Sequence, residues 1–362
     1  MINVNHPRPQ VAARNSPFSI MIHIDGSQGE GGGQILRSSL ALSLVTGKPF
    51  TIENIRANRK KPGLMRQHLT AVQAAATVGR CSVDAKIGAT KLVFEPKGIK
   101  AGNHVFSVGT AGSTTLVFQT VLPALMLAKE PSTLKLQGGT HNPMAPPFDF
   151  LDKVFLPIIN RLGPKIEVKL IRYGFYPAGG GEFQVEIEPV KQLGNLTLLE
   201  RGETVSCSAK IVTAKLPGHV AERERKTLGY LTKLDDSEIK TEVLKETLGP
   251  GNCVMIETGF EHVAELFIGY GEIHVSAEKV AQRAVNQYRD YLQAKVPVGE
   301  FLADQLMLPL GIAAWQGSGA SEFLTRHLTR HSTTHTDILR KFLDIDIVSE
   351  KLNQGRTLVR IG

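Results

Sequence analysis

STTLVFQTVLPALMLAKEPSTLKL, residues 113–136, is the stretch that decides the fold, because two other parts of the chain resemble it. They are GQILRSSLALSLVTGKPFTI (33–52) and EFLADQLMLPLGIAAWQGSGASEF (300–323). Each contains an apolar helix that follows a glycine, then a loop, then a run typical of a strand. Self-similarity of this kind predicts a fold built from repeated units.

The copies at 113–136 and 300–323 match each other most closely. Four positions coincide: Leu116 with Leu302, Gln119 with Gln305, Leu122 with Leu308, and Pro123 with Pro309. A proline inside a helix removes a backbone hydrogen bond, so we expect both helices to be kinked or locally broken.

Each copy is followed by a second helical stretch, at 64–79, 146–162 and about 335–343. Two runs with alternating apolar residues, typical of strands, come after each. These runs are CSVDAKI (81–87) and TKLVFEP (90–96), KIEVKLI (165–171) and GEFQVEIEP (181–189), and DIDIVS (344–349) and TLVRI (357–361). The predicted fold class is therefore α/β (α+β), with three βαβαββ repeats.

The third repeat is interrupted by extra chain. TVSCSAKIVT (204–213) is interpreted as its opening strand, but its first helix begins only near residue 299. The intervening residues have two helices and two strands of their own. We expect a small α/β domain of 215–296, inserted into a large domain of 20–214 plus 297–362.

The composition limits the class of protein. The chain is 42% hydrophobic and 21% charged, and it has no apolar run of the length that crosses a membrane. Residues 1–19 lack the apolar segment of a secretory signal and are interpreted as a disordered extension. Three widely spaced cysteines indicate a reducing compartment, so we expect a cytoplasmic protein with no membrane partner. The net charge of +8 favours polyanionic partners.

Two segments near the start are candidates for phosphate binding. DGSQGEGGGQILRS (25–38) places glycines directly before a helix, where backbone N–H groups can approach a phosphate. It matches neither the P-loop nor the dinucleotide-binding pattern, and the alternative is a flexible turn. Glu30 in this loop could hold Mg²⁺. IRANRKKPGLMRQH (55–68) gathers basic residues on a loop, either as a nucleic-acid patch or as a solvated face.

YGFYPAGGGE (173–182) places three consecutive glycines between two predicted strands. A hairpin loop or bulge explains them as well as close approach to a ligand does.

Histidines cluster in RHLTRHSTTHTDILRKFL (326–343). His327, His331 and His335 would share one face of a continuous helix and could bind a metal. However, the threonines between them disfavour a helix interior, and Thr334 with Asp337 predicts a helix that begins at about residue 335. His331 would then lie just before a helix N-terminus, as a nucleophile or a phosphate ligand, unless all three are surface histidines.

Taken together and in this order, these segments resemble the RNA 3′-terminal phosphate cyclase family from about residue 20 onward. The residues that carry the resemblance are DGSQGEGGGQILRS, NRKKPGLMRQH, GSTTLVFQTVLPAL, GGTHNPMAPP, GFYPAGGGE, HVAERE, GEFLADQLMLP and HSTTHTDILRKFL. The resemblance implies three βαβαββ repeats and a thioredoxin-like inserted domain. It also implies ATP, a divalent cation (Mg²⁺ or Mn²⁺) and RNA 3′-phosphate ends as partners, and it leaves the oligomeric state open, a homodimer being one alternative.

The resemblance further implies a three-step reaction. AMP is first transferred from ATP to a histidine and then to the RNA 3′-phosphate, giving RNA-(3′)pp(5′)-A, from which the 2′-OH expels AMP to leave a 2′,3′-cyclic phosphate. A non-catalytic RNA-binding scaffold for ribosome assembly with the same fold is the alternative.

Transferred position by position, the resemblance assigns the nucleophile to His331 and a metal-contacting role to Glu30. It places Gln119, Pro147, Phe301, Asp304 and Gln305 around the nucleotide, with Pro147 against adenine, and Arg37, Arg56 and Arg59 near the phosphates. The sequence departs from the family pattern at three positions. Phe301 replaces a common tyrosine, His335 a common asparagine, and Tyr173 a usual His or Arg.

Overall fold

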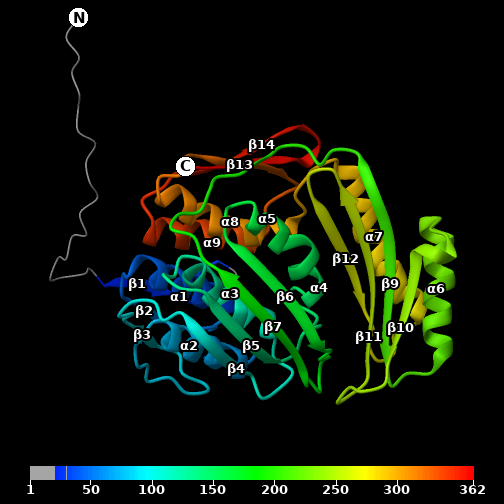
Figure 1. Cartoon of the computed structure of the whole chain (residues 1–362), viewed down its shortest axis with the longest axis horizontal. Coiled ribbons are helices and arrows are strands. Elements are labelled where there is room, and N and C mark those ends of the chain that lie inside the picture. Colours follow the sequence, from blue (N-terminus) through cyan, green and yellow to red (C-terminus); the bar gives the residue numbers. More distant parts are fainter. Residues whose placement is uncertain (1–20, 30) are drawn as a thin grey trace, which may run out of the picture.

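The computed structural model describes residues 21–29 and 31–362, and it arranges them around four small sheets (Figure 1). The predicted extension at residues 1–19 lies outside the described residues. Within the described ranges, no helix is both long and apolar enough to cross a membrane.

The first sheet has three strands in the order β1-β2-β3. They are β1 (Ile22–Asp25), β2 (Phe50–Glu53) and β3 (Leu92–Phe94), and helices α1 (Gly33–Thr46) and α2 (Arg66–Val78) connect them. The strand predicted at 81–87 is not formed. The chain just after it instead pairs with a loop, because Leu64 N donates to Ala89 O and Gly88 N donates to Leu64 O.

The second and third sheets share one pairing pattern, as expected of repeats. In each, the first strand is parallel to the second, the second is antiparallel to the fourth, and the fourth is antiparallel to the third. The second sheet contains β4 (Gly102–Ser107), β5 (Ser132–Gly138), β6 (Lys165–Arg172) and β7 (Gly181–Glu188). The third contains β8 (Thr197–Leu198), β13 (Ser321–Thr325), β14 (Ile347–Lys351) and β15 (Thr357–Ile361).

The segment 204–213 is a strand, as predicted, but it belongs to a different sheet. As β9 (Thr204–Ala214) it lies between β10 (Ile239–Leu244) and β11 (Gly251–Phe260) in the inserted region. The opening strand of the third repeat is β8, whose two residues are too few to show a periodicity. The fourth sheet therefore begins at Thr204, before the predicted boundary at 215.

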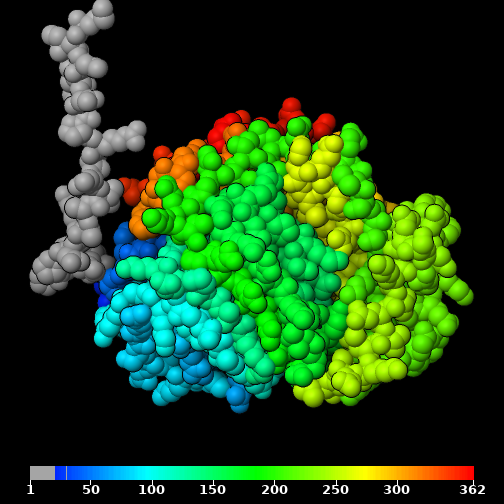
Figure 2. Space-filling model, viewed as in Figure 1, coloured from blue at the N-terminus to red at the C-terminus, as the bar shows by residue number. Residues whose placement is uncertain are grey.

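The fourth sheet has the order β10-β9-β11-β12, with β12 spanning Ala264–Tyr270. Helices α6 (Gly218–Thr232) and α7 (Ala277–Ala294) pack against each other and against this sheet. The inserted segment forms the right-hand lobe of the molecule (Figure 2).

The remaining helices cover the second and third sheets. They are α3 (Thr114–Leu125), α4 (Phe148–Phe150), the π-helical turn η1 (Leu151–Phe155), α5 (Leu156–Asn160), α8 (Glu300–Trp315) and α9 (Arg330–Phe342). Of the 3₁₀ turns, η2 (Asp236–Glu238) contacts β9 and β10 of the fourth sheet, and η3 (Asn353–Gly355) lies between β14 and β15. Helix α1 packs against both α3 and α9. Its sequence is apolar around most of its circumference, and Leu36, Leu40 and Leu42 are fully buried.

Helices α3 and α8 continue past Pro123 and Pro309, so the local break predicted there does not occur. Both prolines are buried in the core, where packing holds the helix together. Because proline has no N–H, the carbonyls of Gln119 and Gln305, four residues earlier, receive no helical hydrogen bond from these positions.

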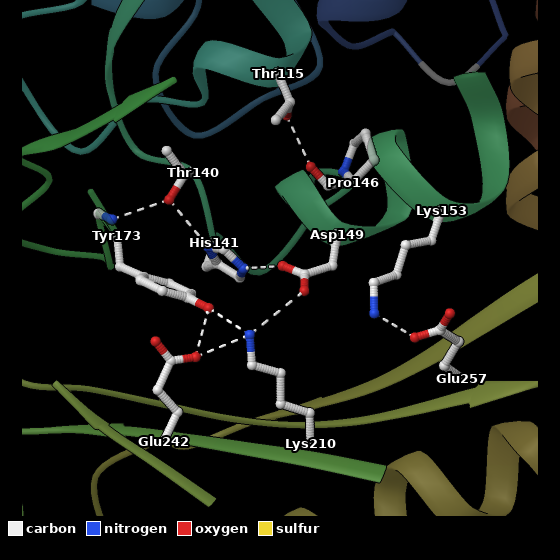
Figure 3. Close-up of polar contacts among 11 residues, drawn as sticks. Thr115, Thr140, His141, Pro146, Asp149, Lys153, Tyr173, Lys210, Glu242 and Glu257 are labelled. Carbon is white, nitrogen blue, oxygen red and sulfur yellow. Dashed lines mark hydrogen bonds and ion pairs between the residues drawn. The ribbon is translucent and has the colours of Figure 1, made fainter. Parts of the chain in front are cut away.

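A polar network joins the inserted sheet to the second repeat (Figure 3). Lys210 on β9 donates to Tyr173 Oη at 2.7 Å and pairs with Glu242 at 2.9 Å, and its Nζ lies 3.9 Å from Asp149. His141 Nε2 lies 2.8 Å from Asp149 Oδ2. Burial alone would raise the pKa of Asp149, but the hydrogen bond with His141 and the nearby lysines hold this pKa below its ordinary value.

The two chain crossings into the inserted segment lie beside each other. The guanidinium of Arg201, before β9, donates to the carbonyls of Tyr291 and Leu292, near the end of α7, at 3.4 Å. The same group lies 4.6 Å from the centre of the Phe260 ring.

Candidate functional site

The glycine-rich loop before α1 fits against α9 and α2 only because it lacks side chains. Gly29 and Gly31 have positive φ values of 58° and 61°. A Cβ at Gly29 would lie 2.1 Å from Thr334 Oγ1 on α9, and one at Gly33 would lie 2.3 Å from His68 Nε2 on α2. Gly32, the N-cap of α1, offers no side chain to the first N–H groups of the helix, which suits this end to an anion.

Helix α9 begins at Arg330, five residues before the predicted start. Thr329 is the N-cap, and its Oγ1 accepts from the backbone N–H groups of His331 at 3.0 Å and Ser332 at 3.2 Å. A contact distant in sequence decides this start, because the carboxylate of Asp304 accepts from the same hydroxyl at 2.8 Å. His331 therefore lies in the first turn of α9 rather than before the helix.

The threonines that follow are tolerated because each hydroxyl has a local acceptor. Thr334 Oγ1 donates to Arg330 O at 2.7 Å, and Thr336 Oγ1 donates to Ser332 O at 3.1 Å. Such bonds to the preceding turn satisfy the hydroxyls inside the helix.

The His331 ring faces α1. Its Nδ1 lies 2.5 Å from Oε1 of Gln34. Burial, together with the charges of Arg37 and Arg59, lowers the pKa of His331 against the opposing effect of Asp304. The imidazole is therefore neutral at pH 7, which is the state that a nucleophile requires.

The polar side chains of Asp304 and Gln305 on α8 form hydrogen bonds with other residues of the protein. Asp304 is half-buried and accepts from the hydroxyls of Thr329 and Ser332, while burial raises its pKa. Gln305 Oε1 accepts from Gln119 Nε2, which ties α8 to α3. The structure thus brings Asp304 next to the start of α9, and the next residue of α8, Gln305, pairs with Gln119 on α3.

Arg37 is partly buried and has no ion pair or hydrogen bond within residues 21–29 and 31–362. Its Nη1 lies beside Gly33, at the N-terminus of α1, where a Cβ would be 2.8 Å away. Burial lowers the pKa of this guanidinium to about 10, so it remains charged at pH 7. A partly buried charge without a partner among the described residues is unfavourable, so this position favours an anionic ligand.

The other two predicted arginines differ in their surroundings. The charge of Arg59 lies close enough to lower the pKa of His331. Arg56 has a positive φ of 55° and donates to the carbonyls of Lys61 and Gly63, at 2.7 and 2.8 Å. The side chain of Arg56 therefore stabilises the conformation of its own loop. Glu30, the predicted metal ligand, lies outside the described residues.

Phe301 and Pro147, both predicted to lie around the nucleotide, differ in their exposure to solvent. Phe301 is 56% exposed on the first turn of α8, three residues before Asp304, so a flat ring can reach it. Pro147 is buried at the start of α4, and the carbonyl of Pro146 accepts from Thr115 Oγ1 at 2.8 Å.

The three-histidine metal alternative does not fit the described part of the chain. His327 precedes α9 and its Nε2 lies 3.5 Å from Glu300, whereas His335 points into the core. Within the described ranges no group of three or more His, Cys, Asp or Glu residues could hold a metal ion.

The glycines of 173–182 lie at the turn between β6 and β7. A Cβ at Gly179 would meet the backbone of Thr110 and Ala111, and one at Gly180 would meet Leu248. Protein neighbours therefore account for these glycines, which supports the hairpin alternative.

Sequence reasoning missed two residues of this site, and it did not predict the burial of a third, His335. Gln34 and His68 lie inside the two phosphate-binding candidate segments, but no periodicity distinguishes them there. Burial and the charges of Arg37 and Arg56 lower the pKa of His68 to about 3. His335 is buried, and its Nε2 has no hydrogen-bond partner in the described structure.

Comparisons with known proteins complete the description. Residues 28–348 match the family model described as RNA 3′-terminal phosphate cyclase. A curated relative from Koribacter versatilis (strain Ellin345), named RNA 3′-terminal phosphate cyclase, is 49% identical over 338 residues, covering 93% of this chain and 94% of that protein.

Proposed function

The chain belongs to the RNA 3′-terminal phosphate cyclase family, and on that premise we propose that it converts RNA 3′-terminal phosphates to 2′,3′-cyclic phosphates with ATP as the activating substrate. The observation that carries this proposal is the neutral imidazole of His331 near the guanidinium of Arg37, at the N-terminus of α1; this guanidinium has no partner in the described part of the chain. A nucleophile and an anion site are thereby combined. We further propose that it acts in the cytoplasm.

In the first step, Nε2 of His331 attacks the α-phosphorus of ATP. An N–P bond forms, the P–O bond to the β-phosphate breaks, and pyrophosphate leaves. The positive charges of Arg37 and Arg59, with the N–H groups at the start of α1, favour the negative charge that accumulates on the phosphate oxygens.

In the second step, an oxygen of the RNA 3′-phosphate attacks the phosphorus of the histidine-bound AMP. The N–P bond breaks, which regenerates His331 and gives RNA-(3′)pp(5′)-A. The adjacent O2′ then attacks the 3′-phosphorus, AMP leaves with the bridging oxygen, and the hydroxyl proton is released. Proximity lowers this last barrier, because the 2′-OH is already attached beside its target.

A divalent cation, Mg²⁺ or Mn²⁺, would offset the charge of the triphosphate when bound. Phosphate oxygens and Glu30 are its proposed ligands. Phe301, Gln119, Asp304 and Gln305 are proposed to line the nucleotide pocket.

Incubation with ATP labelled at the α-phosphate tests the proposal. We expect acid-labile label on the protein, and we expect His331→Ala to abolish it. His327→Ala is the matched control and should keep the label, because that ring is exposed and lies before α9. Label that persists in His331→Ala contradicts the assignment, and tight RNA binding without any AMP transfer would favour the scaffold alternative.

A further inference from the structure

We propose that a polar groove between α2 and β4 binds the part of the RNA strand that precedes the terminal phosphate. This inference rests on the proposed function, since it extends the site of that reaction along the substrate. The groove has a volume of about 320 Å³. It is lined by Thr70, Gln73 and Thr77 of α2, by Asn103, His104, Val105, Phe106 and Ser107 of β4, and by Lys100.

Two regular elements form the walls of the groove. Thr70, Gln73 and Thr77 are three and four residues apart, so they share one face of α2. Consecutive residues of β4 form the other wall, and β4 is an edge strand of the second sheet, so the groove follows the outer edge of this strand. Figure 1 shows α2 next to β4 in the lower part of the molecule.

One end of the groove is near the proposed reaction site and the other is remote from it. At the near end, in the first turn of α2, His68 lies against Gly33 at the N-terminus of α1. At the far end, the backbone N–H of Lys100 donates to the last residue of α2 at 2.7 Å. At 1.5 Å per residue, positions 70–77 span roughly 10 Å, enough for about three nucleotides at the 3.4 Å spacing of phosphates along one strand.

The positive charge of the chain is concentrated around this groove. Residues 55–107 contain ten Lys or Arg and two Asp or Glu, so this segment has a surplus of eight positive charges. The whole chain has the same net charge, +8, so the rest of the sequence is balanced. The segment supplies every residue that lines the groove, and it also contains Arg59 of the proposed site. A partner of this surface is therefore a polyanion.

Several polar side chains of the groove are available to such a partner. Lys100 and Gln73 are exposed, and neither side chain has a hydrogen bond or ion pair with the described part of the chain. Asn103 Oδ1 accepts from Thr133 at 2.6 Å, which leaves the amide N–H groups of Asn103 to donate. None of the described lining residues is acidic. Ammonium, amide and hydroxyl groups are those that bind the phosphates and sugars of nucleic acids.

The two aromatic rings of the groove are not open to a base. His104 and Phe106 are buried, and their rings stack with centroids 5.7 Å apart. His104 Nε2 lies 3.0 Å from the backbone oxygen of Lys100, which connects the ring to the segment before β4. Because bases bind single-strand sites by stacking on open rings, we expect this groove to contact the RNA backbone and to bind without sequence preference.

The length of the RNA tests this placement. We expect the KM for a 3′-phosphorylated RNA in the cyclisation reaction to fall by about tenfold from a dinucleotide to a pentanucleotide and then to remain constant, since about three nucleotides fit the groove. Octanucleotides of different base sequence should have the same KM within about threefold. A wild-type KM that does not depend on length overturns the inference.

Three variants with equal changes in net charge separate the groove from general electrostatics. Lys100→Ala and Gln73→Glu alter the groove, whereas Lys279→Ala, exposed on α7, is the matched control. Each groove variant should raise the KM for an octanucleotide by about fivefold or more. Lys100→Ala should leave the KM for a dinucleotide unchanged, because Lys100 is at the far end. Equal effects of Lys100→Ala and Lys279→Ala on the octanucleotide would contradict the proposal.

Histidine labelling with ATP alone should be the same in all three variants, because this step requires no RNA. Absence of labelling in the wild type would overturn the proposed function rather than the groove, so the two failures are distinguishable.

Binding without catalysis provides a second measurement. The affinity for a 3′-phosphorylated octanucleotide with a 5′ fluorophore is measured by anisotropy without ATP, between about 50 and 200 mM salt. Each phosphate contact to a single strand contributes about 0.7 to the slope of log affinity against log salt. We expect Lys100→Ala to reduce the slope by this amount and Lys279→Ala to leave it unchanged. An unchanged slope in Lys100→Ala would show that no phosphate binds at this end of the groove.

Discussion

Arg37 shows how far a single residue can depart from the usual behaviour of its type. Arginines inside proteins are normally paired, because an enclosed charge without a partner destabilises the fold. Arg37 has no such partner within the described residues, and burial lowers its pKa to about 10. Its position in the sequence, four residues after Gly33, indicates a helix but not this partial burial. The resemblance to a family, rather than any local pattern, predicted it as a phosphate contact.

Replacement of this charge should separate stability from activity. Arg37→Met keeps most of the side-chain volume, so we expect the free energy of unfolding in urea to be unchanged or higher by about 1 kcal/mol. Histidine labelling should fall by about 10²-fold or more. Lys91→Met, at an exposed ion pair, is the control and should alter neither quantity. A marked loss of stability in Arg37→Met would show that the guanidinium has a structural partner.

The pH dependence of labelling follows from His331. Protonation removes the lone pair, so the rate must fall as the pH drops through the pKa of this ring. Because burial lowers that pKa below its ordinary value of 6.5, the rate should be constant near pH 7 and decline only below pH 6.5. Labelling rates at saturating ATP between pH 5 and 8 measure this. A decline centred above pH 6.5 would contradict the buried, neutral ring.

At the scale of elements, α9 shows what local sequence can and cannot predict. The existence of this helix was predicted, but not its first residue, because Thr329 and Thr334 are both plausible caps. The choice depends on Asp304, which is 25 residues earlier in sequence and whose carboxylate accepts from the hydroxyl of Thr329. Likewise, the strand at 204–213 was recognised from its pattern, whereas its sheet was not. Pairing partners are set by tertiary contacts that a period of two residues does not encode.

The start of α9 can be tested by removing one hydroxyl at a time. Thr329→Ala should lower the free energy of unfolding by about 1 kcal/mol, the usual contribution of an N-cap. It should also slow histidine labelling, because it loosens the turn that holds His331. Thr333→Ala is the control, since its exposed hydroxyl bonds only to the preceding turn. Equal stability of the two variants would place the N-cap elsewhere.

At the scale of the whole molecule, the mixed α/β class was predictable from the sequence, and the pairing pattern that the second and third sheets share agrees with the predicted repeats. The contact between the inserted sheet and the second repeat was not predictable, because it depends on Lys210, Tyr173 and Asp149, which are far apart in sequence. No periodicity marks these residues as neighbours. Their proximity depends on how the inserted sheet packs against the second repeat.

This network should contribute measurably to the stability of the fold. Lys210→Met removes the partner of Glu242 and the cation next to the buried Asp149, so we expect a loss of about 2 kcal/mol in the free energy of unfolding. Lys165→Met breaks an ion pair at the surface and is the control, with no expected change. The comparison is made by urea denaturation. Stability equal to that of the control would show that packing alone holds the lobe.

Arg201 holds the segment that enters the lobe next to the segment that leaves it, so the lobe is attached to the rest of the molecule at one edge. A module attached at one edge can be exchanged without stretching the chain that remains. A short glycine bridge across the crossings should therefore leave the three-sheet body closed, and an unrelated domain with adjacent ends could be grafted in its place.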